Sequence, residues 1–320
     1  MHCLNALNQN MDDPYSYYWI DSGSTKIIED AIMEIPEIKK IEDLMMNGQV
    51  EFKYNNAFTF SSIKTNEEDL LSLLLNAGYI TNFENSIYKI PNQEVNFYIF
   101  KNLFPIWLKK RYPESNIKLL LTNFENIPQY GKAFQNEFLD KKGYENHSES
   151  YFKILVASPF VTLPKNDAYK LYSEQTTDAK TRIDVLLSPI NGKSNSVFIL
   201  ELKKTESSEK IEKIINDAFV QVFSRKYADY VLERAEEQEN SHWKNFCIRV
   251  LVFSPNQLKN KWTITIKELI FDKEGLQKAC ETYEQNKGME DSLIELLTPI
   301  ASSISEYPCK SENSSSFKNT

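Results

Sequence analysis

The spacing of apolar and polar positions divides the chain into a helical first part and a second part that contains most of the strands. In the first part, three segments repeat apolar residues at the period of an α-helix, and two short segments between them alternate like strands. The predicted helices cover residues 24–46, with a break at Pro36, then 65–81 and 93–110; the predicted strands cover residues 50–55 and 86–91. We therefore expect a mostly helical domain over residues 1–112.

In the second part, segments with the apolar period of a helix alternate with segments that have the period of a strand. The order helix, hairpin, helix, strand is typical of an α/β domain. After a helical connector over residues 113–142, we expect an α/β domain over residues 143–302 and a disordered polar tail over residues 303–320. Residues 161–180 are polar and irregular. Inside the α/β domain we expect helices over residues 149–160 and 208–235, and strands over residues 181–189, 196–204, 246–255 and 262–271.

The composition limits the partners that we expect the protein to bind and the compartment in which we expect it to act. The chain has 320 residues and a net charge of -8, so a nucleic-acid contact would need a local basic patch. The four cysteines are far apart in the sequence, which is typical of reduced thiols. No signal peptide or transmembrane segment is visible. We expect a cytoplasmic or otherwise intracellular protein with no membrane partner, while secretion as a microbial effector stays open.

The strand over residues 196–204 contains an acid and a base on one face. Glu201 and Lys203 are two residues apart, so their side chains point the same way, opposite to Leu200 and Leu202. Asp184 stands in the preceding strand, and a hairpin would bring the two carboxyl groups together. Buried carboxylates need a partner, and a divalent cation such as Mg²⁺ or Mn²⁺ suits two of them. The alternatives are a salt-bridged edge pair for Glu201 with Lys203 and a strand-end turn residue for Asp184.

The order Asp184, turn, Glu201-x-Lys203, then a helix with Gln221 resembles the PD-(D/E)xK nuclease superfamily. The likeness is greatest to the nuclease-like domain that follows the ATPase module in AAA-ATPase-like proteins. It implies a restriction-endonuclease-like fold, with a mixed central sheet flanked by helices. It also implies that Asp184, Glu201 and Glu149 bind Mg²⁺ or Mn²⁺, that Lys203 positions a water molecule, and that Gln221 supports the catalytic site.

The likeness extends upstream, so that residues 1–112 resemble the lid region of such ATPases; a winged helix or any other small helical domain fits the same pattern. The chain contains no G-x-x-x-x-G-K-[ST] phosphate loop. The sequence Gly192-Lys193-Ser194 falls in the predicted hairpin turn and is read as a turn. We therefore expect a lid region and a nuclease-like domain without the ATPase core, and leave open whether another chain supplies an ATPase.

Several weaker candidates accompany the main set. Glu174 is an alternative acid, and His147 precedes Glu149, although a lone histidine is more often structural. Arg225 and Lys226 could contact phosphates, although charged helix residues are usually only solvated. The aromatic residues Tyr15, Tyr17, Tyr18 and Trp19 could stack on bases, but such clusters more often pack at a corner. Tyr227, which follows Lys226, is expected to pack in the core.

Taken together, these features predict a metal-dependent nuclease that hydrolyses phosphodiester bonds in DNA or RNA. The alternative is a catalytically silent module on a nuclease fold that binds protein or nucleic acid, including a microbial effector that acts on a host protein. A basic rim around Asp184 and Glu201 would favour the nuclease, and an apolar or acidic rim the binding module. The sequence leaves substrate specificity and oligomeric state open.

Overall fold

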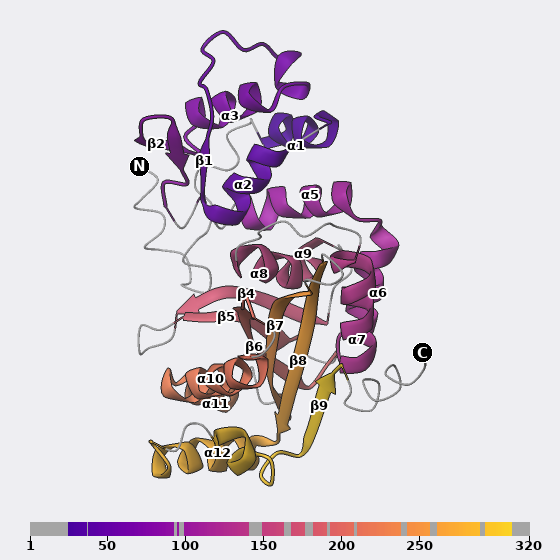
Figure 1. Cartoon of the computed structure of the whole chain (residues 1–320), viewed down its shortest axis with the longest axis vertical. Coiled ribbons are helices and arrows are strands. Elements are labelled where there is room, and N and C mark those ends of the chain that lie inside the picture. Colours follow the sequence, from indigo (N-terminus) through magenta and orange to yellow (C-terminus); the bar gives the residue numbers. More distant parts are fainter. Residues whose placement is uncertain are drawn as a thin grey trace, which may run out of the picture. The chain divides into compact units, whose positions relative to one another are not determined.

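The computed structural model separates the chain into two compact units, residues 1–111 and residues 112–320 (Figure 1). It describes residues 25–36, 38–92, 95, 99–140, 149–162, 168–176, 182–190, 193–207, 210–237, 242–256, 261–288 and 292–308. No helix in these ranges is long and apolar enough to cross a bilayer.

The first unit consists of short helices and a small antiparallel sheet with the strand order β1-β3-β2. As predicted, a helical break separates α1 from α2 at Pro36, and α2 ends at Gly48, whose positive φ of 69° suits glycine. The N-cap of α3 is Asn66, whose side chain accepts a hydrogen bond from the Glu68 amide. The elements are α1 (Thr25–Glu34), α2 (Lys39–Asn47), β1 (Gln49–Glu51), a 3₁₀ turn (Ser62–Lys64), α3 (Glu67–Asn76), β2 (Thr81–Glu84), β3 (Ile87–Lys89), a π turn (Ile99–Leu103) and α5 (Phe104–Arg111).

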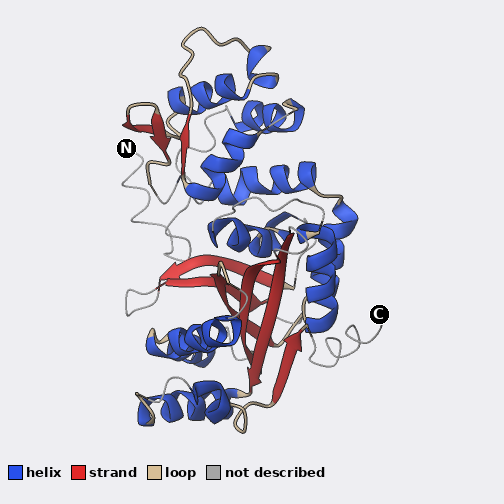
Figure 2. Cartoon of the chain, in the orientation of Figure 1, coloured by secondary structure: helices blue, strands red, loops and turns tan. Residues whose placement is uncertain are grey.

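The second unit is built on a mixed six-stranded sheet with the order β4-β5-β6-β7-β8-β9, which confirms the predicted α/β class (Figure 2). Only β6 and β7 are parallel; every other pair of neighbours is antiparallel. The predicted hairpin is present as β5 and β6. The strands are β4 (Tyr169–Thr176), β5 (Arg182–Pro189), β6 (Ser196–Lys204), β7 (Asn245–Asn256), β8 (Lys261–Phe271) and β9 (Ser303–Tyr307).

Helices cover both faces of this sheet (Figure 1). One face packs on the apolar side of α10 to α13, because Val197, Ile199 and Val250 share a buried cluster with Phe219 and Leu276. The other face packs on α6 to α9 through aromatic rings. The helical segments are α6 (Glu114–Asn123), α7 (Ile127–Phe134), a π turn (Gln135–Leu139), α8 (Glu149–Ala157), α9 (Pro159–Thr162), α10 (Ile211–Ser224), α11 (Tyr227–Glu236), α12 (Lys273–Gln285) and α13 (Leu293–Leu297).

The parallel pair in the centre of the sheet explains why its strands are so apolar. Strand β7 is buried from Phe246 to Pro255, and β6 is buried from Ser196 to Leu202. The helices α10 and α11 form the crossover that parallel strands require. This buried setting surrounds Glu201, so its carboxyl group is removed from water by the fold itself.

Three predicted segments differ from the structure. The helix expected over residues 208–235 is two helices, because Lys226 has a positive φ of 59° and turns the chain between α10 and α11. The segment 161–180, expected to be irregular, contains β4, which pairs with β5.

The third difference concerns the tail, because Ser303–Tyr307 forms β9 against β8 instead of being disordered. Residues 309–320 lie outside the described part of the chain. The helices α6 and α7, expected in a separate connector, lie in the second unit.

Candidate active site

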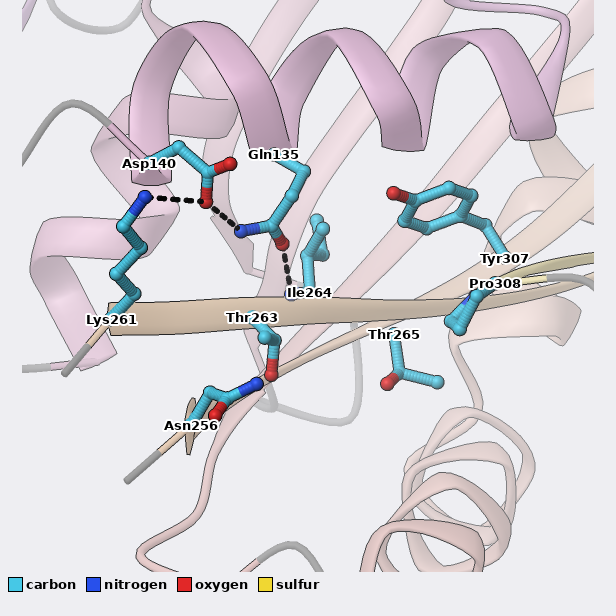
Figure 3. Close-up of a pocket in the computed structure, with 9 residues that line it drawn as sticks. All are labelled: Gln135, Asp140, Asn256, Lys261, Thr263, Ile264, Thr265, Tyr307 and Pro308. Atoms are coloured by element: carbon cyan, nitrogen blue, oxygen red, sulfur yellow. Dashed lines mark hydrogen bonds and ion pairs between the residues drawn. The ribbon is translucent and has the colours of Figure 1, made fainter. Parts of the chain in front are cut away.

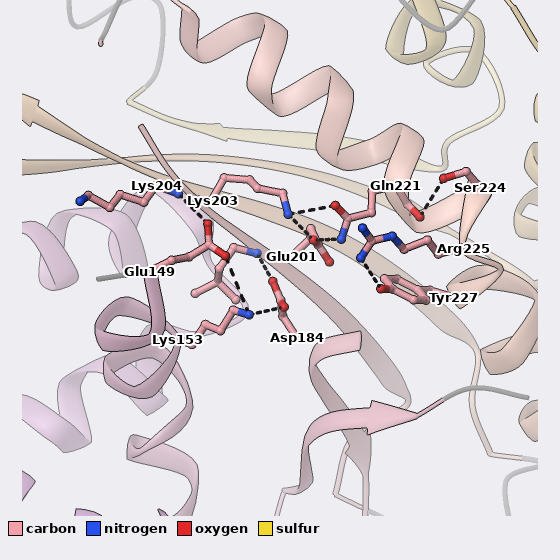
Figure 4. A network of polar contacts seen from close by, with 11 residues as sticks. Glu149, Lys153, Asp184, Glu201, Lys203, Lys204, Gln221, Ser224, Arg225 and Tyr227 are labelled. Carbon is pink, nitrogen blue, oxygen red and sulfur yellow. Dashed lines mark hydrogen bonds and ion pairs between the residues drawn. The ribbon is translucent and has the colours of Figure 1, made fainter. Parts of the chain in front are cut away.

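Strands β5 and β6 and helix α10 bring four predicted site residues together (Figure 4). Glu201 and Lys203 lie on one face of β6, and Asp184 lies on the neighbouring β5. Gln221 lies in the last turn of α10, which packs on that face. Pairs that are 18 to 20 residues apart in sequence therefore meet in one network of polar contacts.

Glu201 is the most enclosed residue of this network, with a side chain that is 0% exposed. Its Oε1 atom accepts a hydrogen bond from Lys203 Nζ at 2.6 Å and another from the Gln221 side-chain amide. Its Oε2 atom is buried and has no hydrogen-bond partner. Burial and then the charge of Asp184 raise the pKa of Glu201 to about 7, although Lys203 and Lys153 oppose this shift.

Asp184 is held by contacts to both of its carboxylate oxygens. The backbone amide of Leu202 donates to Oδ2 at 3.0 Å, and Lys153 Nζ forms an ion pair with Oδ1 at 2.6 Å. Its side chain is only 12% exposed. These contacts fix the Asp184 carboxylate beside β6, where its charge acts on Glu201.

Glu149 lies nearby but takes part in a different set of contacts. It stands in the first turn of α8, and its Oε2 atom accepts a hydrogen bond from the Lys204 backbone amide at 3.2 Å. Its Oε1 atom lies 3.9 Å from Lys153 Nζ. Lys153 thus connects Glu149 to Asp184 through an ammonium group.

The metal ion that the resemblance implies would need several oxygen ligands at this site. Across the described ranges, no three Asp, Glu, His or Cys side chains are grouped so that they could hold a metal ion. Two carboxylates do converge, and the unpaired Oε2 of Glu201 is an oxygen ligand of the kind that divalent cations prefer. A buried carboxylate oxygen in this state needs a proton, a water molecule or a cation as its partner. Asp184 and Glu201 therefore fit a divalent cation as a pair of ligands, with Glu149 engaged elsewhere.

Basic side chains border this acidic pair. Lys153, Lys203 and Lys204 belong to the network, and Lys204 Nζ also pairs with Glu206 Oε1 at 2.7 Å. Arg225 follows α10 and is exposed; its Nη1 donates to the Tyr227 hydroxyl at 3.4 Å.

The charges of Asp184 and Glu201 also act on the Arg225 guanidinium. The Tyr227 hydrogen bond raises the pKa of Arg225, and the charges of Glu201 and Asp184 act in the same direction. As predicted, Tyr227 itself is buried in the core.

Several weaker sequence candidates lie where the structure describes no side chain. His147 and the aromatic residues Tyr15, Tyr17, Tyr18 and Trp19 lie outside the described residues, and so does the side chain of Glu174. Lys153 was not predicted. Its signal was present in the sequence, because Lys153 stands four residues after Glu149 and must share its helical face.

A pocket of about 340 Å³ opens elsewhere in the second unit, between the π turn that follows α7 and the strands β8 and β9 (Figure 3). The amide of Gln135 bridges the edge of β8 by donating to the Trp262 carbonyl at 2.9 Å and accepting from the Ile264 amide at 3.2 Å. It thus satisfies backbone groups that an adjoining strand would otherwise pair. The one acid and the one base in its lining, Asp140 and Lys261, face each other at 3.9 Å. The pocket therefore lies where Gln135 closes the edge of β8, and the acid and the base in its lining pair with each other.

Among the comparisons with known proteins, a family model matches part of the chain. No curated protein and no solved structure matches the chain. Residues 147–263 match the model of a family described as PD-(D/E)XK nuclease superfamily. The matched segment contains Asp184, Glu201, Lys203 and Gln221, together with four of the six strands in full and the beginning of β8. The match supports a relationship between this part of the chain and the PD-(D/E)XK nuclease superfamily.

Proposed function

We propose that this protein is a metal-dependent phosphodiesterase that cleaves DNA or RNA at the network around Glu201. The observation that carries the proposal is the fully buried Glu201 carboxylate, which has one unpaired oxygen and lies beside a second carboxylate and a lysine. Such an arrangement is costly for the fold unless cations offset it, because two like charges are forced together in a place of low dielectric. Arrangements of this kind are concentrated at catalytic sites.

The residues of the network have distinct roles in this proposal. Asp184 and Glu201 would hold a Mg²⁺ or Mn²⁺ ion, which would supply a polarised water and stabilise charge on a phosphate. Lys203 keeps Glu201 oriented through Oε1 and leaves Oε2 available. Gln221 holds both the Lys203 ammonium and the Glu201 carboxylate, so it fixes their relative position.

The positive side chains around the pair suit a nucleic-acid backbone. Arg225 and Lys204 lie at the border of the network, and a phosphate chain would find cations there although the whole chain carries a net charge of -8. We further propose that the first unit is related to the lid region of AAA-ATPase-like proteins and that any ATPase would be a separate chain. The proposed localisation is intracellular.

A second function is favoured by a specific observation. Lys153 occupies one oxygen of Asp184, and the described residues contain no group of three metal-binding side chains. A catalytically silent module that binds nucleic acid or protein would account for both facts.

The decisive experiment incubates the protein with labelled single- and double-stranded DNA and RNA in Mg²⁺, Mn²⁺ or EDTA. We expect cleavage in metal that falls by at least about a hundredfold in Asp184→Asn and Glu201→Gln, as removal of a main charge-stabilising group does. The matched control is Glu295→Gln, because Glu295 is an exposed acid on α13.

Three outcomes separate the two functions. Metal-dependent cleavage that survives in Glu295→Gln but not in the site variants supports the nuclease. Binding of nucleic acid without cleavage in any metal supports the silent module. Cleavage that persists in Asp184→Asn and Glu201→Gln would remove this site from the reaction.

A further inference from the structure

Lys153 is the one network residue whose position conflicts with a metal ion at Asp184. Its Nζ atom lies 2.6 Å from Asp184 Oδ1, the distance of a direct charge-assisted hydrogen bond. The other oxygen, Oδ2, already accepts the backbone amide of Leu202. A cation at Asp184 would therefore share Oδ1 with the Lys153 ammonium or Oδ2 with the Leu202 amide, and at either oxygen it would lie close to that ammonium.

The charge balance of the network also opposes a divalent cation beside the Lys153 ammonium. When both carboxyl groups are ionised, the charges of Asp184 and Glu201 are matched by the two ammonium groups of Lys153 and Lys203, so this group of four is neutral. Addition of a divalent cation would leave two positive charges in excess within a few ångströms, which is strongly unfavourable in a buried place. Lys203 is held by Glu201 and Gln221, whereas Lys153 already lies between the carboxylates of Asp184 and Glu149, so Lys153 is the ammonium group that can change its main partner within the site.

The structure provides a second position for the ammonium group. Glu149 stands one helical turn before Lys153 on α8, and its Oε1 atom is already within 3.9 Å of Lys153 Nζ. The Glu149 side chain is 40% exposed, so a lysine held there would be better hydrated than one held at Asp184. A short movement of a flexible side chain would exchange one carboxylate for the other.

We propose that Lys153 is a resident cation that competes with a divalent metal ion for Asp184, moves to Glu149 when the metal binds, and so sets the metal concentration at which the site fills. This inference rests on the proposed metal site and adds its regulation by a residue of the chain. Lys153 is here a positioning residue: it acts on the metal through Asp184. Glu149 acquires a role that differs from metal ligation, namely that of receiving the displaced ammonium group.

The test measures metal affinity directly. Mn²⁺ and Mg²⁺ are titrated by calorimetry into the wild-type protein, Lys153→Met and Lys153→Arg, without nucleic acid. Methionine keeps the length and flexibility of the lysine stem and removes the charge, whereas arginine keeps the charge. We expect the dissociation constant to fall about tenfold or more in Lys153→Met and to stay near the wild-type value in Lys153→Arg.

Lys118→Met is the matched control. Lys118 forms the same i,i+4 pair with Glu114 on α6, at 2.8 Å, but its side chain is 63% exposed. It should leave metal affinity unchanged. Circular dichroism and thermal melting of each variant establish that the folded proteins are compared.

Each outcome decides the matter. Tighter binding in Lys153→Met alone supports the competition, and so does binding in Lys153→Met when the wild type binds no metal. Equal or weaker binding in Lys153→Met overturns the competition but leaves the metal site intact. Absence of metal binding in all variants overturns both this inference and the proposed metal-dependent function.

Discussion

Arg249 and Glu268 lie opposite each other on β7 and β8, and Glu201 lies on the adjoining β6. All three side chains are buried in the same sheet, yet their surroundings differ. Arg249 forms an ion pair with Glu268, with Nε and Nη2 at 2.8 and 2.7 Å from the same oxygen. Its guanidinium also faces aromatic rings, including that of Phe124 at 4.2 Å.

The site at Glu201 has the opposite character. Glu201 shares its surroundings with a second carboxylate, its Oε2 atom has no partner, and its pKa is raised to about 7. The Arg249 pair joins opposite charges inside an apolar shell, whereas the Glu201 network forces like charges together and draws in lysines from two elements. Arg249 Nη1 is also buried without a hydrogen-bond partner, so neither buried charge nor an unpaired polar atom separates the two regions; the like charge beside Glu201 does, and such pairs are concentrated at functional sites.

The largest expected effect comes from removal of Arg249 from its ion pair with Glu268. Arg249→Met should lower the free energy of unfolding by about 3 to 5 kcal/mol, because Glu268 is left buried without its partner. Urea denaturation followed by circular dichroism measures the loss. The double variant Arg249→Met with Glu268→Leu should recover most of it, since an apolar pair can replace a buried ion pair. A double variant as unstable as the single one would show that Arg249 matters for its packing on the rings instead.

The next effect concerns the pH dependence that Glu201 gives to stability. Its folded pKa of about 7 lies above the ordinary value of 4.5, so the folded state holds a proton that the unfolded state has released. This contribution to stability is fully present below pH 4.5 and is lost as the pH rises through 7, by up to about 3 kcal/mol.

Urea midpoints between pH 5 and pH 8, measured in EDTA, test this effect. Relative to the wild type, Glu201→Gln should lose the decline with rising pH and be the more stable protein at pH 8. The exposed-acid control Glu295→Gln should retain the wild-type slope. Equal slopes in the wild type and Glu201→Gln would contradict an elevated Glu201 pKa.

The smallest expected effect comes from removal of the Gln221 amide from the Glu201 network. Gln221→Met removes one donor to Glu201 and one acceptor for Lys203, and should cost about 1 to 2 kcal/mol. Because the lost donor favours the ionised form of Glu201, the cost should be larger at pH 8 than at pH 5. The same urea series measures both values, and an equal cost at the two pH values would place Gln221 outside the electrostatics of Glu201.

Much of the fold could be predicted from local patterns, and the misses have physical reasons. The strands around Asp184 and Glu201 were predicted because buried strands are dense in β-branched and aromatic residues. Strand β9 was missed because Ser303–Tyr307 is polar and depends on pairing with β8. The break at Lys226 was missed because no glycine or proline marks it, and a lysine adopts the left-handed conformation there.

At the candidate site, too, local spacing predicted some features and packing decided the others. The spacing of Glu201 and Lys203 determined that they share a face, and the helical spacing of Glu149 and Lys153 determined that they share another. Which partners meet was decided by packing. Lys153 reaches Asp184 rather than pairing with Glu149 alone, and Gln221 meets Glu201 because α10 packs on β6.

The sequence by itself determined the residue types of the network, the strand faces on which they lie and the α/β order that places them in one domain. These properties follow from backbone periodicity, which acts over a few residues. Only the tertiary structure decided that Glu201 is fully buried with one unpaired oxygen and that Lys153 neutralises Asp184. Burial and charge balance are sums over groups far apart in the chain, and they have no local signature.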